Sequence, residues 1–209
     1  MACAEPSSSD TTMDQAMKDD DVQQPENKNV TETRGGKDNA LGEQALIAAE
    51  NNDLQLLRKL IADDPSLVNA RDSDLYTPLH RACYNGHLLI VKFLLDNGAD
   101  INASTVDGWK PLHCASKWNK CECALALVAA GADVNATTNG GQTPLHLAAS
   151  KQNAHDTVEF LLWQSSIDPN KTNAAGDTPK DLALRSGELS DLFEMVEPSV
   201  NCLYPPDEP

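Results

Sequence analysis

A four-residue motif that recurs at an almost constant interval constrains the fold of this 209-residue chain more than any other feature. The copies are Thr77-Pro78-Leu79-His80, Lys110-Pro111-Leu112-His113, Thr143-Pro144-Leu145-His146 and Thr178-Pro179-Lys180-Asp181, and their prolines lie 33, 33 and 35 residues apart. A second series runs in phase with the first: Val68-Asn69, Ile101-Asn102, Val134-Asn135 and Pro169-Asn170. Two series that share one period predict a stack of similar units, each packed on its neighbours.

Each copy of the motif predicts the start of a helix. The threonine hydroxyl can cap the first turn, and the proline after it has no N–H to leave unpaired and a φ angle suited to a helix. Lys110 replaces this threonine in one unit, which predicts a weaker cap. A second helix, residues 88–96 in one unit, is rich in core-forming residues and ends at Gly98, which can adopt the left-handed cap. The predicted fold class is all-α.

The motif and its period resemble the ankyrin repeat, a pair of helices and a β-turn with the pattern T-P-L-H-x-A. The resemblance implies an ankyrin-repeat solenoid of about five repeats, near residues 41–70, 71–103, 104–136, 137–171 and 172–197. The first and last repeats lack the full motif, as capping repeats do. The fourth period is longer, and we expect its two extra residues around Gln152 to His155, in the loop between its helices.

The two ends of the chain differ in composition from the repeats. Residues 1–40 contain no Leu, Ile, Phe, Tyr or Trp and carry nine acids against four bases. Such a segment cannot bury enough apolar surface to offset the entropy lost on ordering. We therefore predict a disordered acidic tail at 1–40, an ankyrin repeat domain at 41–197 and, from its prolines, a disordered tail at 198–209.

The charge of the chain narrows the choice of partners. It has 16 Lys+Arg and 32 Asp+Glu, a formal net charge of −16, whereas nucleic acids and anionic membranes attract basic surfaces. We expect neither as a direct partner. The first ten residues lack the basic and apolar regions of a secretory leader, and the longest apolar run, residues 123–130, is too short to span a bilayer. We predict a location in the nucleus, the cytoplasm or both.

The resemblance gives the histidines and cysteines structural roles. In ankyrin repeats the motif histidine bonds the backbone between adjacent turns, and this structural role is expected for His80, His113 and His146. His87 and His155 occupy the loop between the two helices of a repeat. Cys121-Glu122-Cys123 lacks the spacer of common zinc sites. No phosphate-binding glycine motif is present. We therefore predict no enzyme activity, no metal and no cofactor.

Aromatic residues mark a candidate partner-binding surface. Tyr76 and Trp109 share one position of the repeat, and Tyr84 and Trp118 share another to within one residue. In ankyrin stacks these positions line the concave face, and we expect all three tryptophans, Trp163 included, to lie outside the core. The predicted contact set, used by a monomer to bind one or more proteins, is Asp74, Tyr76, Tyr84, Asp107, Trp109, Lys117, Trp118 and Lys151. The alternative is that the rings pack on one another and stiffen the hairpin tips.

A longer sequence match points to one group within the ankyrin-repeat family. Residues 105–113, T-V-D-G-W-K-P-L-H, followed by Lys117-Trp118-Asn119, resemble one group of ankyrin-repeat proteins. This resemblance implies a nuclear or nucleocytoplasmic protein that acts without enzymatic activity in transcriptional control or germ-cell development. We predict a protein interaction scaffold. The alternatives are an inhibitor that masks a transcription factor or kinase, and an adaptor to a ubiquitin ligase or a membrane enzyme.

Two asparagines resemble the targets of the oxygen-dependent asparaginyl hydroxylase that modifies ankyrin repeats. Asn102 and Asn135 each have Leu eight residues before them and Asp two residues before them, whereas Asn69 has neither. The resemblance implies hydroxylation at Asn102 and Asn135 and not at Asn69. The alternative is that each asparagine only braces its hairpin through backbone hydrogen bonds.

Overall fold

The computed structural model describes residues 34–187 and 189–194, and every regular element in them is helical. The helices are α2 (Arg34–Glu50), α3 (Leu54–Asp63), the 3₁₀ helix η1 (Pro65–Asn69), α4 (Pro78–Asn85), α5 (Leu88–Asp96), α6 (Pro111–Lys117), α7 (Cys121–Ala129), α8 (Pro144–Ala149), α9 (His155–Leu162), α10 (Pro179–Ser186) and α11 (Ser190–Glu194). The predicted all-α class is confirmed. None of these helices is both long enough and apolar enough to cross a membrane.

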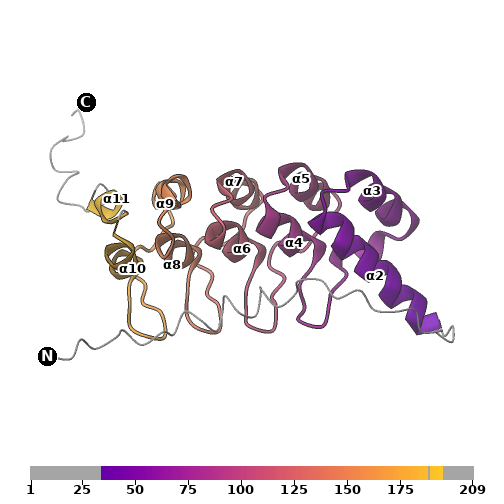
Figure 1. The fold of residues 1–209 in the computed structure, drawn as a ribbon, viewed down its shortest axis with the longest axis horizontal. Coiled ribbons are helices and arrows are strands. Elements are labelled where there is room, and N and C mark those ends of the chain that lie inside the picture. The colour runs from indigo at the N-terminus through magenta and orange to yellow at the C-terminus, as the bar shows by residue number, and fades with distance from the viewer. Residues whose placement is uncertain (1–33, 188, 195–209) are drawn as a thin grey trace, which may run out of the picture. The chain divides into compact units, whose positions relative to one another are not determined.

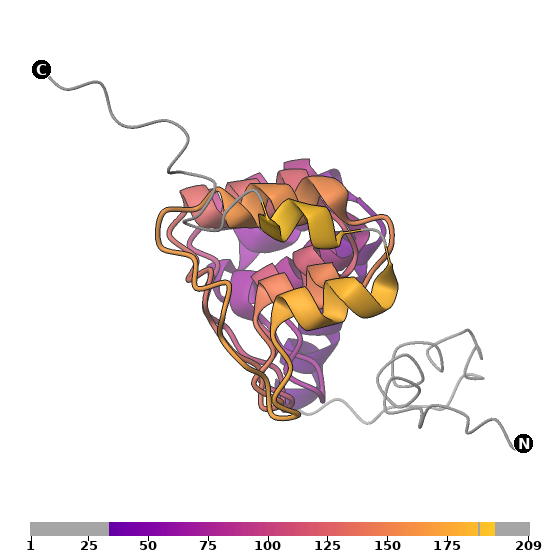
Figure 2. The same ribbon diagram turned by 90° about the vertical axis from the view of Figure 1, so that its left-hand side faces the viewer.

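The helices form pairs that stack side by side (Figure 1). The first helices of the pairs, α2, α4, α6, α8 and α10, make one row in which each contacts the next. The second helices, α3, α5, α7, α9 and α11, make the other row. Viewed along the stack, the long loops that join one pair to the next all project to the same side (Figure 2). The pairs correspond to the five predicted repeats.

The first repeat begins earlier than predicted. We placed its start at residue 41, but α2 begins at Arg34, so residues 34–40 belong to the first helix and not to a tail. Composition misled the prediction, because this segment lacks large apolar residues yet also lacks a proline that would stop a helix from extending. The rest of the predicted tails, residues 1–33 and the segment from 198 on, lies outside the described residues.

Threonine caps start three of the first helices. The hydroxyls of Thr77, Thr143 and Thr178 accept hydrogen bonds from backbone N–H groups three residues later, as the motif predicts. Helix α6 starts differently: the Lys110 side chain makes no cap, and of the two capping-box bonds this helix has the one from the backbone N–H of Lys110 to Nδ1 of His113, at 2.9 Å. The ammonium group has no lone pair to accept a hydrogen bond, so the first turn of α6 has half of the usual capping box.

A thin apolar core runs through all the repeats. The motif leucines Leu79, Leu112 and Leu145 are fully buried, and the second helices add Leu94, Leu127 and Leu161 to the same layer. The small buried alanines of the first helices, Ala82, Ala115 and Ala148, let neighbouring repeats approach closely. Because this layer is shared between neighbours, each repeat depends on the adjacent ones for its stability.

The fourth repeat holds its two extra residues in two places. Helix α9 starts eleven positions after Pro144, whereas α7 starts ten positions after Pro111, so only one extra residue lies in the loop between the helices. The other follows α9, where Ser165-Ser166-Ile167 stands in place of Gly131-Ala132. Gly131 turns the chain with a φ of 97°, and without such a glycine the turn takes one residue more. The prediction that both residues lie before α9 was therefore wrong for one of them.

Candidate partner-binding surface

Three side chains at the ends of consecutive first helices form a row. Tyr84 lies in the last turn of α4, Trp118 is the C-cap of α6, and Lys151 follows α8. The ring centroids of Tyr84 and Trp118 are 4.8 Å apart with a 60° angle between the ring planes, and Nζ of Lys151 is 5.4 Å from the centroid of the Trp118 ring. The rings do pack on each other, as the alternative prediction held, yet all three residues are only half-buried. They form one continuous surface across three repeats.

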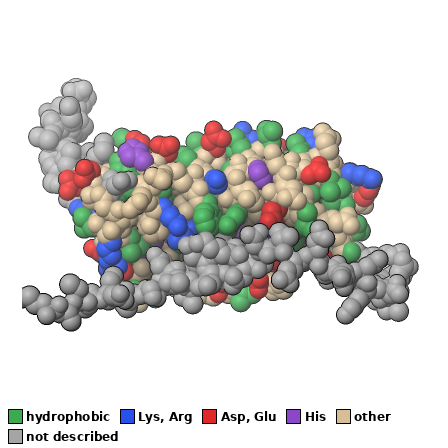
Figure 3. Space-filling model, viewed as in Figure 1, with side chains coloured by type: hydrophobic (Ala, Val, Ile, Leu, Met, Phe, Trp, Pro, Cys, Tyr) green, Lys and Arg blue, Asp and Glu red, His purple; other side chains and the backbone are tan. Residues whose placement is uncertain are grey.

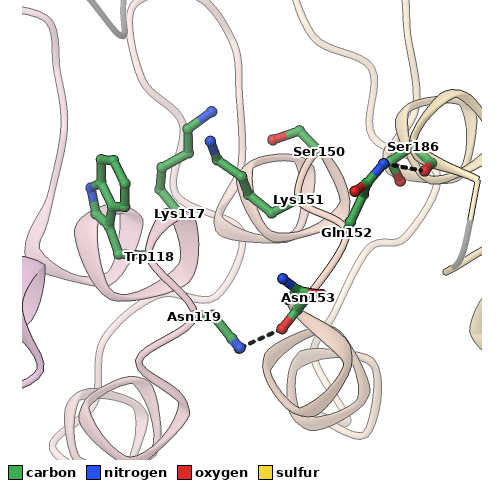
Figure 4. A pocket seen from close by; sticks show the side chains of 8 residues that line it. All are labelled: Lys117, Trp118, Asn119, Ser150, Lys151, Gln152, Asn153 and Ser186. Atoms are coloured by element: carbon green, nitrogen blue, oxygen red, sulfur yellow. Dashed lines mark hydrogen bonds between the residues drawn. The ribbon is translucent and has the colours of Figure 1, made fainter.

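A hollow of about 500 Å³ opens beside this row (Figure 4). It is lined by residues at the ends of the first helices of the third, fourth and fifth repeats and in the turns that follow: Lys117, Trp118, Asn119, Ser150, Lys151, Gln152, Asn153 and Ser186. Three of the predicted contact residues, Lys117, Trp118 and Lys151, therefore meet at one site. We refer to the eight lining residues as the hollow.

Amide and hydroxyl groups of the hollow are held by hydrogen bonds between repeats. The Asn119 amide donates to the backbone carbonyl of Asn153 and accepts from the hydroxyl of Thr157 at 2.7 Å. The Gln152 amide donates to the backbone carbonyl of Ser186, whose hydroxyl in turn lies 3.1 Å from the carbonyl oxygen of Ala149. These bonds fix the floor of the hollow before any partner arrives, which lowers the entropy lost on binding.

The charge of the hollow is opposite to the charge of the chain. Its two charged residues are Lys117 and Lys151, although acids outnumber bases 32 to 16 in the sequence. The hollow is thus a local basic site on an acidic protein.

The two acidic residues of the predicted contact set, Asp74 and Asp107, lie at hairpin tips and not in the hollow. Asp74 and Asp107 are exposed, and their backbone carbonyls accept hydrogen bonds at 3.0 Å from Val106 and Asn139 of the next tip. Neither lines the hollow. The backbones of these two aspartates therefore join the tips, while their carboxylates lie on a separate part of the surface.

Tyr76 lies at the base of a tip and packs on its own repeat. Its ring is 5.6 Å from the ring of His80, and the guanidinium carbon of Arg81 lies 5.3 Å from its centroid. Burial is the main cause that raises the pKa of the phenol well above its usual range. Tyr76 is therefore a partly buried packing residue that does not line the hollow.

Trp109 corrects the sequence prediction. We expected it at an exposed tip, but its side chain is only 6% exposed and belongs to the apolar core. Its backbone is locked in the hairpin, with its N–H bonded to the Thr105 hydroxyl and its carbonyl to the N–H of Thr105. The ring lies 6.3 Å from the ring of His113, over the start of α6. Trp118 and Trp163 lie outside the core as predicted, and Trp163 is 74% exposed.

The motif histidines connect neighbouring repeats. His80, His113 and His146 each bond a backbone carbonyl of the following repeat or hairpin through Nε2, at 3.1, 3.0 and 3.0 Å. Burial lowers the pKa of His80 and of His113 to about 4 and also lowers that of His146. Neutral rings enclosed by backbone partners hold the fold together and are not placed to transfer protons to a substrate.

The described cysteines are free thiols, and three of them are core residues. Burial raises the pKa of the Cys114 thiol to about 12 and that of Cys123 to about 11, and it raises that of Cys83 as well. Such thiols are protonated and unreactive at neutral pH. Within residues 34–187 and 189–194, no group of three or more His, Cys, Asp or Glu side chains is placed to hold a metal ion.

The two candidate asparagines differ in their surroundings. Asn135 is half-buried; its side chain accepts from the N–H of Asp168 at 2.9 Å and donates to the carbonyl of Ser166, so it braces the next repeat. The exposed Asn102 instead accepts from a side-chain group, Nζ of Lys110, 3.2 Å away in the next repeat. The bracing alternative therefore describes Asn135 better than Asn102.

Five residues of the hollow were missed at the level of sequence: Asn119, Ser150, Gln152, Asn153 and Ser186. Each is an ordinary polar residue within its own repeat. The signal that could have found them is register, because all of them lie six to nine positions after the motif proline of their repeat. Aligned repeats place these positions side by side in the stack.

Comparisons with known proteins agree with this geometry. A family model described as Ankyrin repeats (3 copies) matches residues 45–138 and 104–173. The chain is similar to ankyrin repeat domain-containing protein 49 from Bos taurus, with 55% identity over 157 residues that make up 75% of this chain and 66% of the relative. The same protein from Mus musculus is 59% identical over 160 residues, 77% of this chain and 67% of the relative. The Drosophila melanogaster protein is 51% identical over 157 residues, 75% of this chain and 73% of the relative.

The matched segment thus spans about two thirds of the bovine and mouse relatives. With the family model matching most of the described residues and the helix pairs stacking at the predicted period, the chain belongs to the ankyrin repeat family.

Proposed function

We propose that this chain is a non-enzymatic protein-binding module whose partner contacts the hollow and the adjoining row of Tyr84, Trp118 and Lys151. The observation that carries the proposal is this row itself: an aromatic pair and a lysine, half-buried on three consecutive repeats, beside a hollow of about 500 Å³. Trp and Tyr that are fixed by their neighbours lose little entropy on binding and commonly anchor interfaces. Ankyrin repeats as a family mediate protein–protein interactions, which supports the same conclusion.

We further propose that the module acts in the nucleus or between nucleus and cytoplasm, as a scaffold in transcriptional control or germ-cell development. This rests on the resemblance of residues 105–119 to one group of ankyrin-repeat proteins and on the similarity to the relatives above. An inhibitor that masks a transcription factor or kinase would use the same surface and would differ in the consequence of binding.

The test compares two tryptophans of opposite placement. The full chain, its Trp118→Ala variant and its Trp163→Ala variant are used to isolate partners from nuclear and cytoplasmic extracts, and the bound proteins are quantified by mass spectrometry. We expect at least one specific partner to be lost by Trp118→Ala and retained by Trp163→Ala, because Trp163 is exposed but lies at the end of a second helix, away from the hollow.

Retention of every partner by Trp118→Ala, with its helical content unchanged, would contradict the proposed surface. Loss of the same partners by both variants would also contradict it, because the effect would then not be specific to the row. Circular dichroism of each variant separates loss of binding from loss of fold.

A further inference from the structure

We propose that the hairpin tips of the second and third repeats form a second docking surface, separate from the hollow, for a segment of a partner protein that is both apolar and basic. The exposed side chains of Leu75 and Val106 receive its apolar residue. The exposed carboxylates of Asp74 and Asp107 pair with its Lys or Arg residues. This site goes beyond the proposed function, because it lies outside the hollow and takes an occupant of stated chemistry.

The backbone of Leu75 is the first observation. In the described part of the chain, the hairpin tips each place a residue in the left-handed region at one register position: Leu75, Gly108, Gly141 and Gly176, with φ angles of 66°, 77°, 72° and 82°. The N–H of this residue closes the turn, as that of Leu75 does on the carbonyl of Asp72 at 3.1 Å. Glycine adopts this conformation freely, whereas the Cβ of leucine crowds the backbone there. The first tip therefore carries a leucine where the turn itself favours glycine.

The fold gives Leu75 little burial in return for this strain. Its side chain is 38% exposed and does not belong to the apolar core that the repeats share. Strained backbone positions are typical of sites that bind a ligand or a partner, because there the side chain is selected for contact and not for stability. We therefore infer that Leu75 serves a contact outside its own chain.

Val106 of the next tip lies beside Leu75. The N–H of Val106 donates to the carbonyl of Asp74 at 3.0 Å, which joins the two tips next to Leu75. The following repeat shows where a side chain at this position points, because a Cβ atom on Gly108 would lie 2.9 Å from the backbone nitrogen of Asn139, the counterpart of Val106. The Val106 side chain is 59% exposed. Register thus places two exposed apolar residues side by side across two tips.

Exposed carboxylates flank this apolar pair. Asp74 and Asp107 each stand next to one of the two apolar residues in the sequence. The carboxylate of Asp72 is paired with Arg81 at 2.9 Å, whereas Asp74 and Asp107 join the tips through their backbone carbonyls, which leaves their carboxylates exposed. The tips lie along the lower edge of the molecule in Figure 1, and acidic and hydrophobic side chains are visible at that edge in Figure 3.

The charges of the tips determine the occupant. A Lys or Arg side chain can pair with the exposed carboxylates while an apolar neighbour covers Leu75 and Val106, so that one segment uses both parts of the surface. The net charge of −16 attracts a basic segment and repels an acidic one. A second copy of this chain is disfavoured as the occupant for the same reason, because it would bring further carboxylates to the tips.

The test selects peptides that need Leu75. A phage-displayed library of short random peptides is first depleted on the immobilised Leu75→Gly variant of the full chain, which removes peptides that bind other surfaces, the hollow included. The remaining phage are selected on the immobilised wild-type chain. We expect enrichment of peptides that contain Lys or Arg next to an aliphatic or aromatic residue. Enrichment of acidic or uncharged peptides, or of none over a surface without protein, overturns the inference.

Matched aspartate variants test the charges. The enriched peptides are synthesised and titrated by fluorescence anisotropy. The double variant Asp74→Asn, Asp107→Asn should weaken their binding at least about fivefold and reduce its dependence on salt. The control Asp63→Asn, Asp96→Asn removes the same charge from exposed positions on α3 and α5 and should change the affinity by less than about twofold. Equal affinities for wild type and the Asp74/Asp107 variant, or equal weakening in both double variants, contradict the proposed pairing and overturn the inference.

Two substitutions of Leu75 separate binding from folding. Leu75→Gly and Leu75→Ala both remove the apolar side chain and should weaken peptide binding at least about tenfold. Glycine also relieves the left-handed backbone and alanine does not, so Leu75→Gly should melt at the higher temperature of the two. A melting temperature of Leu75→Gly at or below that of Leu75→Ala, or a loss of helical content in Leu75→Gly, would show that Leu75 is a packing residue and would overturn the inference.

Trp118→Ala distinguishes this site from the hollow. The enriched peptides should bind Trp118→Ala as tightly as wild type, within about twofold, because the hollow is a separate surface. Equal weakening by Trp118→Ala and Leu75→Gly overturns the assignment to the tips. The loss of partners in Trp118→Ala tests the hollow alone, so either proposal can fail while the other stands.

Discussion

The Nε2–H of His80 donates a hydrogen bond to the backbone carbonyl oxygen of Trp109, 3.1 Å away, and so joins the second repeat to the third. The other ring nitrogen, Nδ1, accepts from the backbone N–H of Thr77 at 3.2 Å. A backbone N–H can only donate, so Nδ1 must carry a lone pair and the ring must be neutral. The same arrangement at His113, whose Nε2 bonds the carbonyl of Ala136, places a second neutral ring at the end of the third repeat.

Stability should therefore fall in mild acid. The pKa of His80 and of His113 is about 4 in the folded chain and about 6.5 when unfolded, so between these values the unfolded state binds more protons. Their contribution is fully present above about pH 6.5 and is lost as the pH falls toward 4. We expect the free energy of unfolding to decrease by about 1 to 2 kcal/mol per histidine between about pH 7 and pH 5. Guanidinium denaturation at several pH values measures this, and a constant free energy across that range would contradict it.

Replacement of Trp109 by alanine should destabilise the protein strongly. The ring is 6% exposed within the core, and the loss of such a ring costs about 3 to 5 kcal/mol. Trp163→Ala is the matched control, because its ring is 74% exposed, and it should change stability by no more than about 0.5 kcal/mol. Guanidinium denaturation with an unchanged slope is the measurement. Similar effects of the two substitutions would place Trp109 outside the core.

The burial of the Trp109 ring could not be predicted from the repeat pattern. The period of the motif predicts the helix pairs, their order and their caps, because those depend on residues close together in the chain. The direction of a ring at a hairpin base depends instead on contacts with the neighbouring repeat. Tyr76 occupies the same position one repeat earlier and is half-buried against Arg81, whereas Trp109 is buried. One register position thus leads to two environments, which the pattern alone does not distinguish.

The hollow was predictable only in part for a related reason. The sequence prediction found Lys117, Trp118 and Lys151 because aromatic and charged residues stand out within a repeat. It missed Asn153 and Ser186, whose roles arise from hydrogen bonds or contacts with the preceding repeat. Interfaces between repeats are built from pairs of positions about one period apart, and a single repeat carries only half of each pair.

Lys110→Thr should stabilise the third repeat. A threonine hydroxyl could accept from the backbone N–H of His113, as Thr77 does for His80, and a regained cap is worth about 1 kcal/mol. The substitution also removes the exposed hydrogen bond from Lys110 to Asn102, a loss of about 0.5 kcal/mol. The melting temperature should rise by about 1 to 2 °C.

Lys110→Ala is the control for this substitution, because it removes the bond to Asn102 without supplying a hydroxyl. Calorimetry should rank Lys110→Thr above wild type and wild type above Lys110→Ala. A Lys110→Thr melting temperature at or below that of Lys110→Ala would show that the missing hydroxyl is not the weakness of α6.

We propose that hydroxylation by the asparaginyl hydroxylase favours Asn102 over Asn135. Asn102 is exposed and its side chain accepts one hydrogen bond, from the Lys110 side chain, whereas the half-buried Asn135 side chain bonds the backbones of Asp168 and Ser166 in the next repeat. Displacement of Asn135 would break two bonds between repeats. Mass spectrometry of protein co-expressed with the hydroxylase should find a single-oxygen addition mainly on the Asn102 peptide and none on the Asn69 peptide. More modification at Asn135 or Asn69 than at Asn102 would refute this order.

The extra residues of the fourth repeat, one on each side of α9, have a consequence for how such a chain tolerates changes in length. The contacts between the fourth and fifth repeats keep the register seen between earlier repeats. The backbone N–H of Ala174 bonds the carbonyl of Gly140 at 3.0 Å, and Nε2 of His146 bonds the carbonyl of Asp177 at 3.0 Å. The insertion is absorbed locally and its phase error does not propagate to α10. Contacts with the preceding repeat set the position of each repeat. Insertions or deletions at either end of a second helix can therefore accumulate without loss of register between the repeats.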